Sequence, residues 1–383
     1  MPNGPCICDM AGLYVHIPFC KSRCSYCNFF SSTQWNLMEN VVKAISKEIT
    51  LRTDYLPQDP LSTIYWGGGT PSTLPEEAVE IIMQQIRASF PIDDNAEITI
   101  EVNPDDVTDS KADFWHKMGF NRVSMGIQSF DNKVLQTIRR RHTAEQAKIA
   151  VATLKQSGFN NISIDLIYAL PLQDMQTWQQ DISTALQLNV QHISSYGLSF
   201  EPDTPLYIMK QQGEVVEQED CMYNEMYDLL CNQLQQHGFE HYEVSNFALP
   251  GYRSRHNSSY WNDIPYCGIG PGAHSYNGHS RQWNVEDLTQ YINKLNQDIL
   301  PCEVEHLTEY QKWEEYVMLR LRTIEGINLS HAAMIYGEER VDKCLQQASQ
   351  YLKQGYLLHT NKSLHATSYG IKILNRIISD LID

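Results

Sequence analysis

Apolar and polar residues follow two different patterns between residue 12 and about residue 200. Six short runs rich in β-branched and aromatic residues are typical of strands: 13–17, 63–66, 97–102, 122–127, 162–168 and 192–198. Longer stretches between them carry apolar residues three and four positions apart, as amphipathic helices do: 37–51, 76–90, 109–118, 144–157 and 175–188. Six βα units in a row predict a parallel sheet with helices outside it.

The first predicted strand is not followed by a G-x-G-x-x-G turn, which argues against a dinucleotide-binding sheet. The pattern therefore favours an α/β chain folded as a full or partial barrel, here a partial (β/α)6 barrel similar to part of a TIM barrel. Barrels place their chemistry at the C-terminal ends of the strands. Glycines 67–69, Glu101 and Gln128 lie at such ends, Asp165 lies within the fifth strand, and a cysteine cluster follows the first.

The regular alternation stops after residue 200. We expect a helix at 219–237 and a strand at 242–247. A turn-rich stretch, 250–284, follows and contains many Gly, Asn, His, Tyr and Trp residues. That composition predicts a loop that builds a site rather than a spacer.

The C-terminal part reads as a separate helical module. Helices are predicted at 309–321, 338–353 and 368–382, with a hairpin at 356–365. This outline is similar to a winged helix, but few basic residues cluster on its recognition helix, so DNA binding is not expected. The chain is therefore divided into an N-terminal extension (1–11), a barrel domain (12–300) and a C-terminal helical, winged-helix-like domain (301–383).

Composition narrows the class of protein. With 42% hydrophobic residues, a chain of 383 residues can bury a large core, which excludes disorder. It carries 46 acidic against 29 basic residues, for a formal net charge of -17, whereas binding to a nucleic-acid backbone relies on clustered Lys and Arg. Nucleic acid is therefore not an expected partner. No apolar run approaches the roughly 18 residues of a spanning helix and no export signal is evident, so we expect a cytoplasmic protein.

Ten cysteines in a reducing compartment are expected to be thiols or metal ligands. Cys20, Cys24 and Cys27 form a C-x-x-x-C-x-x-C motif after the first predicted strand, and thiolates on one loop select an iron–sulfur cluster or zinc. A closed zinc site usually takes its fourth ligand from a second C-x-x-C pair, which the sequence lacks. Three cysteines on a four-iron cluster leave one iron open to a small chelating molecule. A structural zinc loop and unrelated free thiols are the alternatives.

The cysteine spacing resembles the radical S-adenosylmethionine (SAM) superfamily, whose members bind SAM at the open iron. Further segments carry the resemblance: His16-Ile-Pro-Phe-Cys20, Gly67-Gly-Gly-Thr-Pro71, Glu101-Val-Asn-Pro104, Ser124-Met-Gly-Ile-Gln128-Ser-Phe130 and Ile164-Asp165-Leu-Ile-Tyr-Ala-Leu-Pro171. They look like the oxygen-independent coproporphyrinogen III oxidase group and, within it, the HemW branch of haem chaperones. The match runs from about residue 13 to beyond residue 280, and the C-terminal module fits as well.

The resemblance implies a radical SAM barrel with a defined set of cofactor contacts. Cys20, Cys24 and Cys27 would hold a 4Fe-4S cluster, and the SAM contacts would be Tyr14, Gly68, Gly69, Thr70, Glu101, Gln128, Arg140 and Asp165. The residue types suit these roles, because glycine lets the backbone approach a ligand and a carboxylate accepts hydrogen bonds from ribose or ammonium groups. Arg140 can pair with the SAM carboxylate. A solvated basic patch is the alternative for Arg140, since Arg139 and Arg141 flank it.

Two features distinguish the branches of the family. The coproporphyrinogen-oxidising branch has a fourth cysteine where this chain has Phe29, an aromatic residue that we expect to shield the cluster from water and pack against adenine. The sequence His256-Asn-Ser-Ser-Tyr260-Trp261 matches the H-N-x-x-Y-W motif of the chaperone branch. His256 is the first candidate for the axial ligand of haem iron, with Tyr260 and Trp261 lining the pocket, and His274 is a weaker candidate. The alternative is a packed segment in which His256 is merely hydrogen-bonded.

The resemblance implies a chain that binds haem and passes it to acceptor proteins, with a separate electron donor for the cluster. Whether it is an enzyme stays open, because SAM can serve as a ligand without being consumed. The alternative function is a radical SAM coproporphyrinogen III oxidase or dehydrogenase. A radical SAM enzyme that modifies RNA or protein is a distant third, because the chain is acidic and has no added basic domain.

Three further expectations concern the surroundings of the barrel. Peripheral membrane association is compatible with the family, although no amphipathic anchor is evident. The carboxylates of haem and SAM need local cations, for which Arg140, Arg253 and Arg255 are candidates. Residues 1–9, with Cys6 and Cys8, are expected to be an upstream extension before a start at Met10.

Overall fold

The computed structural model describes residues 11–57 and 59–382. Cys6, Cys8 and the start expected at Met10 therefore lie outside the described residues.

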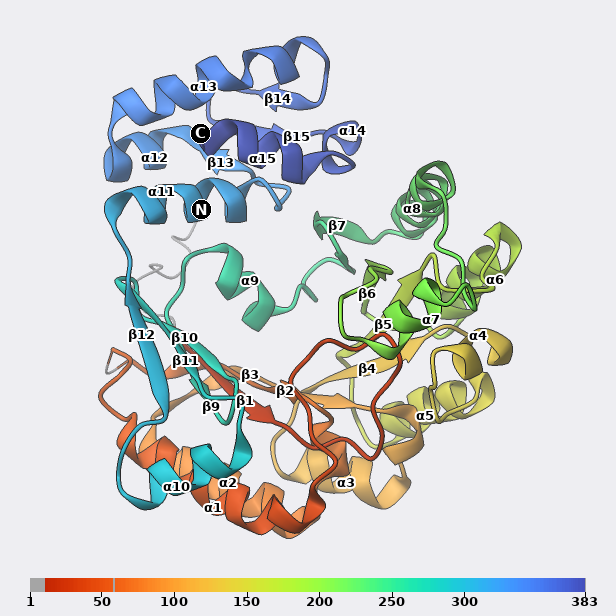
Figure 1. The fold of residues 1–383 in the computed structure, drawn as a ribbon, viewed down its shortest axis with the longest axis vertical. Helices are drawn as coiled ribbons and strands as arrows, with labels where there is room; N and C mark the ends of the chain where they lie inside the picture. The colour runs from red at the N-terminus through yellow and green to blue at the C-terminus, as the bar shows by residue number, and fades with distance from the viewer. Residues whose placement is uncertain (1–10, 58, 383) are drawn as a thin grey trace.

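Six parallel strands form the centre of the large sheet: β1 (Ala11–Ile17), β2 (Leu61–Gly68), β3 (Ile92–Val102), β4 (Arg122–Gln128), β5 (Ile162–Tyr168) and β6 (His192–Gly197). The outer layer comprises α1 (Met38–Leu51), α2 (Glu76–Ser89), α3 (Asp109–Lys117), α4 (Asn132–Thr137), α5 (Ala144–Gln156) and α6 (Met175–Gln187). Figure 1 shows these helices outside the strands. The predicted α/β order of βα units is confirmed, and the differences lie at the ends of elements and in the short helix α4.

Further strands extend this sheet on both sides. Beyond β1 lie β9 (Tyr266–Ile269), β10 (His274–Tyr276), β11 (Ser280–Asn284) and β12 (Cys302–His306), and beyond β6 lie β8 (Asn246–Ala248) and β7 (Glu240–Glu243). Within the described residues the sheet ends at β12 on one side and at β7 on the other, so the barrel is partial. The remaining helices of this unit are α7 (Pro205–Gln211), α8 (Asp220–Gln236), α9 (Arg255–Trp261), α10 (Leu288–Asn296) and three short 3-10 turns, Trp35–Leu37, Pro71–Thr73 and Pro104–Asp106.

Two predictions between residues 240 and 284 were wrong. The single strand expected at 242–247 is the antiparallel hairpin of β7 and β8. The stretch 250–284 is not a loop, because it contains α9 and three strands. The glycines of this stretch do more than make turns. A Cβ added to Gly268 would lie 2.0 Å from the backbone oxygen of His274, so this glycine lets β9 and the first residue of β10 lie close together.

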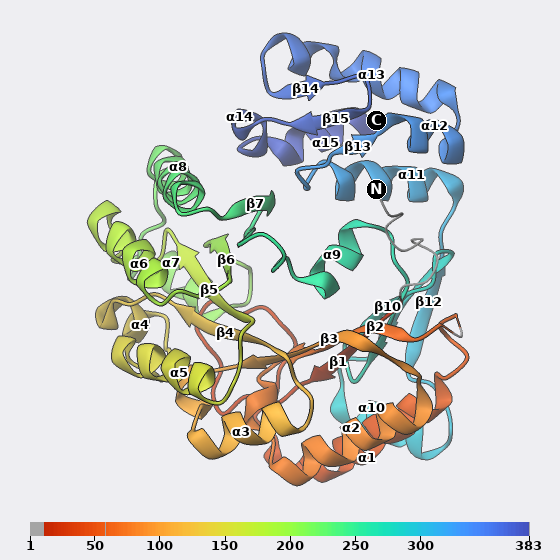
Figure 2. The same cartoon turned by 180° about the vertical axis from the view of Figure 1, so that it is seen from behind.

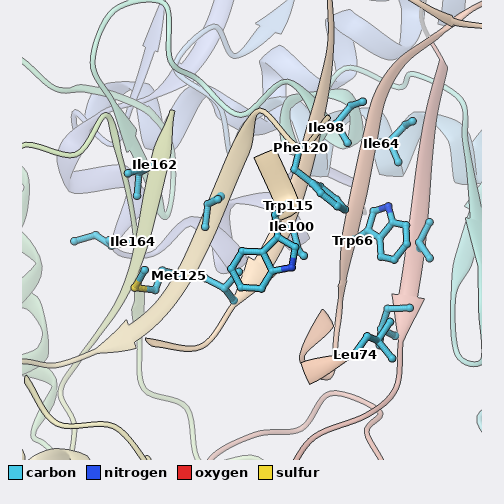
Figure 3. Packing of buried hydrophobic residues seen from close by; sticks show 14 of the residues in the cluster. Ile64, Trp66, Leu74, Ile98, Ile100, Trp115, Phe120, Met125, Ile162 and Ile164 are labelled. Carbon is cyan, nitrogen blue, oxygen red and sulfur yellow. The ribbon is translucent and has the colours of Figure 1, made fainter. Parts of the chain in front are cut away.

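The strands separate two chemically different faces. Alternate residues point toward the outer helices and form the main hydrophobic core, which includes Ile64, Trp66, Ile100 and Met125 (Figure 3). The other residues of the same strands are mostly polar. We call their side the inner face and define it by Tyr14, His16, Thr63, Tyr65, Thr99, Glu101, Arg122, Ser124, Ser163, Asp165, His192 and Ser194.

The C-terminal domain has its own core, with Trp313, Val317, Leu364 and Ile377 among its buried residues. It comprises α11 (Glu309–Arg320), β13 (Ile327–Asn328), α12 (Leu329–Tyr336), α13 (Glu338–Lys353), β14 (Leu357–His359), β15 (Ser363–Ala366), α14 (Ser368–Ile371) and α15 (Leu374–Ile382). The predicted hairpin is present as β14 and β15, and the helix expected at 368–382 is two helices. Because β12 still pairs with β11, the domain begins at α11 rather than at residue 301.

The helix α9 lies between the large sheet and the C-terminal domain (Figures 1 and 2). It begins at the N-cap Ser254, whose side chain accepts a hydrogen bond from the backbone N–H of Asn257. No helix of the described residues has the length and apolar character needed to cross a membrane.

Candidate functional site

The inner face is a continuous polar wall. Tyr14 lies beside Tyr65 in the register of β1 and β2, Tyr65 beside Thr99, and Thr99 beside Arg122. Tyr65 also donates a hydrogen bond, at 2.8 Å, to Glu101, which lies two residues after Thr99 on β3. This wall leads to the C-terminal strand ends, where the cysteine loop begins.

The cysteine loop spans residues 18–32, between β1 and α1. Backbone hydrogen bonds from Cys20 N to Ser32 O and from Ser32 N to Pro18 O close its base. Its three thiols are free and partly exposed. Burial raises the pKa of the Cys20 and Cys27 thiols, and a charge on Cys24 raises both further. The three sulfur atoms are thus near enough to interact electrostatically.

The loop also touches polar side chains from the segments that follow β2 and α4. The Cys20 sulfur lies 3.3 Å from the Thr70 hydroxyl, and the Arg140 guanidinium donates to the Cys24 sulfur at 3.4 Å. Within the described residues, no three His, Cys, Asp or Glu side chains come close enough to hold a single ion. Three cysteine thiols on one loop fit an iron–sulfur cluster, which takes thiolate ligands.

The glycine segment after β2 packs tightly against this loop. Gly68 has a φ of +103°, and a Cβ added to it would lie 2.5 Å from the His16 ring. A Cβ on Gly69 would lie 2.8 Å from the backbone of Pro18 and Phe19. The backbone N–H groups of Gly69 and Thr70 donate to Ile17 O and Phe19 O. The glycines bring Thr70 to Cys20, whereas the predicted contact of this segment with SAM stays a prediction.

Two acidic side chains of the inner face have raised pKa values. Burial raises the pKa of Glu101 to about 7 and that of Asp165 to about 6. Hydrogen bonds oppose the shift, from Tyr65 to Glu101 at 2.8 Å and from Ser124 to Asp165 at 3.3 Å. Both side chains keep some exposure to solvent. Their arrangement suits a cationic ligand, because a positive charge would compensate the cost of ionising them.

Arg140 is not part of a solvated patch, because its side chain turns toward the cysteine loop. It donates to Asn103 Oδ1 at 2.7 Å and to the carbonyl oxygen of Gly126, in addition to Cys24. Its Nε is buried without a hydrogen-bond partner. Such a donor fits an anionic group of a ligand. Nearby, Gln128 is buried at the end of β4, with a φ of 74°.

Phe29 does not cover the cysteines, whereas its expected packing against adenine stays a prediction. Its side chain is 72% exposed. Phe30 packs inward instead, with its ring 6.1 Å from that of His16 and its carbonyl oxygen 3.0 Å from His16 Nε2. Because Phe30 is held by its backbone and its ring, the preceding residue points outward.

The H-N-x-x-Y-W segment lies at the opposite end of the barrel from the cysteines. The backbone N–H groups of Arg255 and His256 donate to the carboxylate of Glu97, near the N-terminal ends of the strands. The His256 ring is buried against the inner face of strands β1 and β2 and stacks on Tyr65 with ring centroids 5.1 Å apart. The structure places this motif on the helix α9, where the carboxylate of Glu97 fixes the first turn.

Both ring nitrogens of His256 are already engaged. Nδ1 lies 2.8 Å from the Thr63 hydroxyl, and Nε2 lies 2.8 Å from the Tyr260 hydroxyl. Burial lowers the pKa of His256 to about 3, so the ring is neutral. Trp261 has a buried indole N–H without a partner, and its carbonyl oxygen accepts from Arg320. This geometry matches the alternative in which His256 is hydrogen-bonded within a packed segment.

Two of the three arginines proposed as local cations bind other residues of the protein. Arg253 pairs with Glu240 at 3.1 Å and with Glu325 at 2.7 Å. The Arg255 guanidinium donates to the carbonyl oxygen of Asn95 at 2.6 Å. Arg140 is the cation that lies beside the cysteine loop.

Sequence reasoning missed Arg122 and Thr99 on the inner face. Arg122 is 1% exposed, and its Nε and Nη1 atoms have no hydrogen-bond partner. The signal was the alternation within the strands, as in Arg-Val-Ser-Met-Gly-Ile-Gln at 122–128, where every second residue is polar or glycine. A strand buried on two apolar faces would not alternate in this way.

The partial barrel and the three-cysteine loop are those of the radical SAM superfamily, whose family model matches residues 14–185. A model described as the HemN C-terminal domain matches residues 307–372. Among solved structures, coproporphyrinogen III oxidase (HemN) of Escherichia coli shares the fold, with a TM-score of 0.84 and 23% identity over 97% of this chain and 89% of that one.

Curated relatives narrow the assignment. Heme chaperone HemW of Bacillus subtilis is 33% identical over 95% of this chain and 97% of its own length. Heme chaperone HemW of Lactococcus lactis is 31% identical over 96% of each chain. A mitochondrial radical S-adenosyl methionine domain-containing protein 1 of Bos taurus is 30% identical over 97% of this chain and 87% of the relative. The chain belongs to the HemW family.

Proposed function

We propose that this protein is a haem chaperone, which binds haem and transfers it to acceptor proteins while it carries a 4Fe-4S cluster with SAM bound. The observation that carries the proposal is the similarity to proteins named heme chaperones over nearly the whole chain, including the C-terminal domain. Phe29 stands where the oxidase branch has a fourth cysteine, which favours the chaperone over the oxidase.

Cys20, Cys24 and Cys27 would hold the cluster, and the predicted SAM contacts would surround it. When bound, the cluster supplies reducing electrons and an open coordination site for SAM. The Thr70 hydroxyl beside Cys20 and the Arg140 guanidinium beside Cys24 stabilise thiolate charge. Glu101 is placed to accept from a cationic ammonium group, and Arg140 has a free donor for a carboxylate.

The role of α9 follows from its contacts. For His256 to ligate haem iron, the helix would have to release Thr63 or Tyr260, because neither ring nitrogen is free. Haem contacts of His256, Tyr260 and Trp261 therefore require α9 to move. Without such a movement the segment stays packed on the N-terminal ends of the strands.

The function is tested with the anaerobically reconstituted full-length protein. Ferric haem (hemin) is titrated into it, and coproporphyrinogen III with SAM and a reductant is supplied in a parallel reaction. The proposal expects a saturable Soret band and no protoporphyrinogen. Formation of protoporphyrinogen at a rate that depends on the cluster would instead support the coproporphyrinogen-oxidising alternative.

A further inference from the structure

Arg122, the first residue of β4, carries a buried positive charge without a partner. Its side chain belongs to the inner face and is 1% exposed. Nε and Nη1 are buried without a hydrogen-bond partner, and no carboxylate of the described residues forms an ion pair with the guanidinium. Buried polar groups are nearly always hydrogen-bonded, and a buried charge left without a partner is costly. Within the described residues, the chain does not supply the acceptor that this guanidinium requires.

A second buried donor lies beside the guanidinium. Thr99 is the partner of Arg122 in the register of β3 and β4, and it is fully buried. Its hydroxyl group also has no hydrogen-bond partner. A hydroxyl and a guanidinium can both donate, whereas an ionised carboxylate only accepts and has two oxygen atoms to do so. The two side chains together therefore have the chemistry that recognises a carboxylate.

Two carboxyl groups of the protein lie near Arg122 but do not bind it. Burial raises the pKa of Glu101 and of Asp165, and the positive charge of Arg122 offsets this only in part. Tyr65 donates to Glu101, and Ser124 donates to Asp165. Glu101 lies opposite Ser124, two residues beyond Arg122 along the sheet. The place beside Arg122 and Thr99 is thus left for an acceptor from another molecule.

The position of Arg122 along the barrel indicates which molecule that is. Arg122 begins β4, whereas Gln128 ends this strand near the cysteine loop. Burial and the charge of Arg122 lower the pKa of His192 and of His256, so the guanidinium lies near both rings. The His256 ring of α9 also stacks on Tyr65, which adjoins Thr99 in the sheet. A ligand that displaced α9 from the inner face would therefore reach Arg122.

We propose that Arg122 and Thr99 bind a carboxylate inside the barrel, and that this carboxylate is a propionate group of haem. The inference rests on the proposed haem-chaperone function. Haem propionates are ionised at pH 7, and a guanidinium binds a carboxylate through two parallel hydrogen bonds. The carboxylate of SAM has the same chemistry, so the test has to distinguish the two sources. No covalent bond is made or broken in this step.

The test compares hemin with hemin dimethyl ester, whose propionates carry no charge. Both are titrated into the anaerobically reconstituted, full-length protein at pH 7 in the same buffer. We expect the unchanged protein to bind hemin about tenfold more tightly than the ester. Arg122→Gln should lose this preference, because its affinity for hemin falls by about tenfold while its affinity for the ester stays within about twofold.

Two further variants separate recognition of the carboxylate from the folding of the barrel. Arg122→Lys retains the charge without the planar fork, so it should keep part of the preference for hemin. Thr99→Val removes the second donor and should weaken binding of hemin but not of the ester. Arg87→Gln is the matched control, because Arg87 is an exposed arginine of α2 that donates to the carbonyl oxygen of Met118. It should keep the full preference for hemin.

Each other result decides against a stated part of the inference. Equal losses of hemin and ester binding in Arg122→Gln would mean that Arg122 only supports the barrel wall. A loss of SAM binding, measured by equilibrium dialysis, with the preference for hemin retained would assign the carboxylate to SAM. Retention of both the preference and SAM binding in Arg122→Gln, or equal binding of hemin and ester by the unchanged protein, rejects the propionate site alone. If the unchanged protein shows no saturable hemin binding, the haem-chaperone function itself fails.

Discussion

Cys24 is the central cysteine of the motif by its contacts as well as by its place in the sequence. Its charge raises the pKa of both other thiols, and it receives the hydrogen bond from Arg140. We predict that Cys24→Ser loses the cluster after anaerobic reconstitution, because a serine hydroxyl is a poor substitute for a thiolate ligand of iron.

Iron and sulfide content and the visible spectrum of the reconstituted protein measure this loss. Cys221→Ser is the control, because Cys221 is an exposed thiol on α8, and its iron content should equal that of the unchanged protein. Full iron retention in Cys24→Ser would contradict the three-cysteine cluster.

Glu101 gives the protein a pH dependence whose sign can be worked out. Burial raises its pKa from 4.5 to about 7, so the folded protein binds this proton more tightly than the unfolded chain. The stabilising contribution is complete below pH 4.5 and is lost as the pH rises through about 7. We predict that, without SAM, Glu101→Gln loses less stability between pH 5 and pH 8 than the unchanged protein does, by about 1–3 kcal/mol.

Chemical denaturation at the two pH values measures that difference. Glu39→Gln, on the exposed side of α1, should keep the pH dependence of the unchanged protein. If the free energy of unfolding changes equally with pH in Glu101→Gln and in the unchanged protein, the pKa of the Glu101 carboxyl group is not raised. Addition of SAM should reduce the pH dependence, because a bound cation favours the ionised form.

At the scale of elements, the carboxylate of Glu97 holds α9 in place. It accepts the backbone N–H groups of Arg255 and His256 at 3.1 and 3.0 Å, at the positive end of the helix. We predict that Glu97→Gln weakens this anchor by about 1–3 kcal/mol, because a neutral amide is the weaker acceptor. Hydrogen exchange of the α9 amides should become faster, while exchange in β4 should not change.

Glu303→Gln is a suitable control for the loss of a charge, since Glu303 is exposed on β12. It should leave exchange in α9 unaltered. Unchanged α9 exchange in Glu97→Gln would mean that His256 and its two hydroxyl partners hold the helix without the carboxylate.

An element could be predicted from the sequence where the residues that cause it lie close together in the chain. The βα units were predicted because each strand and helix carries its own periodicity, as in 162–168 and 175–188. The strands β9 to β11 were missed because their glycines are explained only by distant partners. Gly270 must be a glycine because of the backbone of His16, which lies far away in the sequence. A local pattern cannot show such a contact.

The same limit applies to the candidate site. The spacing of Cys20, Cys24 and Cys27 is local, and the motif predicted their loop. The burial of His256 depends on Thr63 and Glu97 of other strands, which its own motif does not show, and its predicted haem contact stays a prediction.

At the scale of the whole molecule, α9 links two separate cores. Arg320 of α11 donates to the carbonyl oxygen of Trp261 and to the Asn262 side chain, and Glu325 pairs with Arg253. We predict that Arg320→Ala separates the unfolding of the two domains by a few degrees, because it removes a link of roughly 1 kcal/mol between them. Differential scanning calorimetry should show a broader or divided transition.

Arg340→Ala serves as the comparison, since Arg340 contacts the Glu309 carbonyl oxygen within the C-terminal domain. It should shift only the transition of that domain. A single, sharp transition in Arg320→Ala would show that other contacts, such as that between Lys372 and Asp228, suffice to couple the domains.

The place of α9 on the N-terminal ends of the strands has a consequence for the order of events in the proposed function. As long as α9 stays in place, haem and SAM would both have to approach from the cofactor end. An acceptor protein that docked at that end would cover the same opening. Reloading would then wait for its departure, so one haem would be delivered for each docking event.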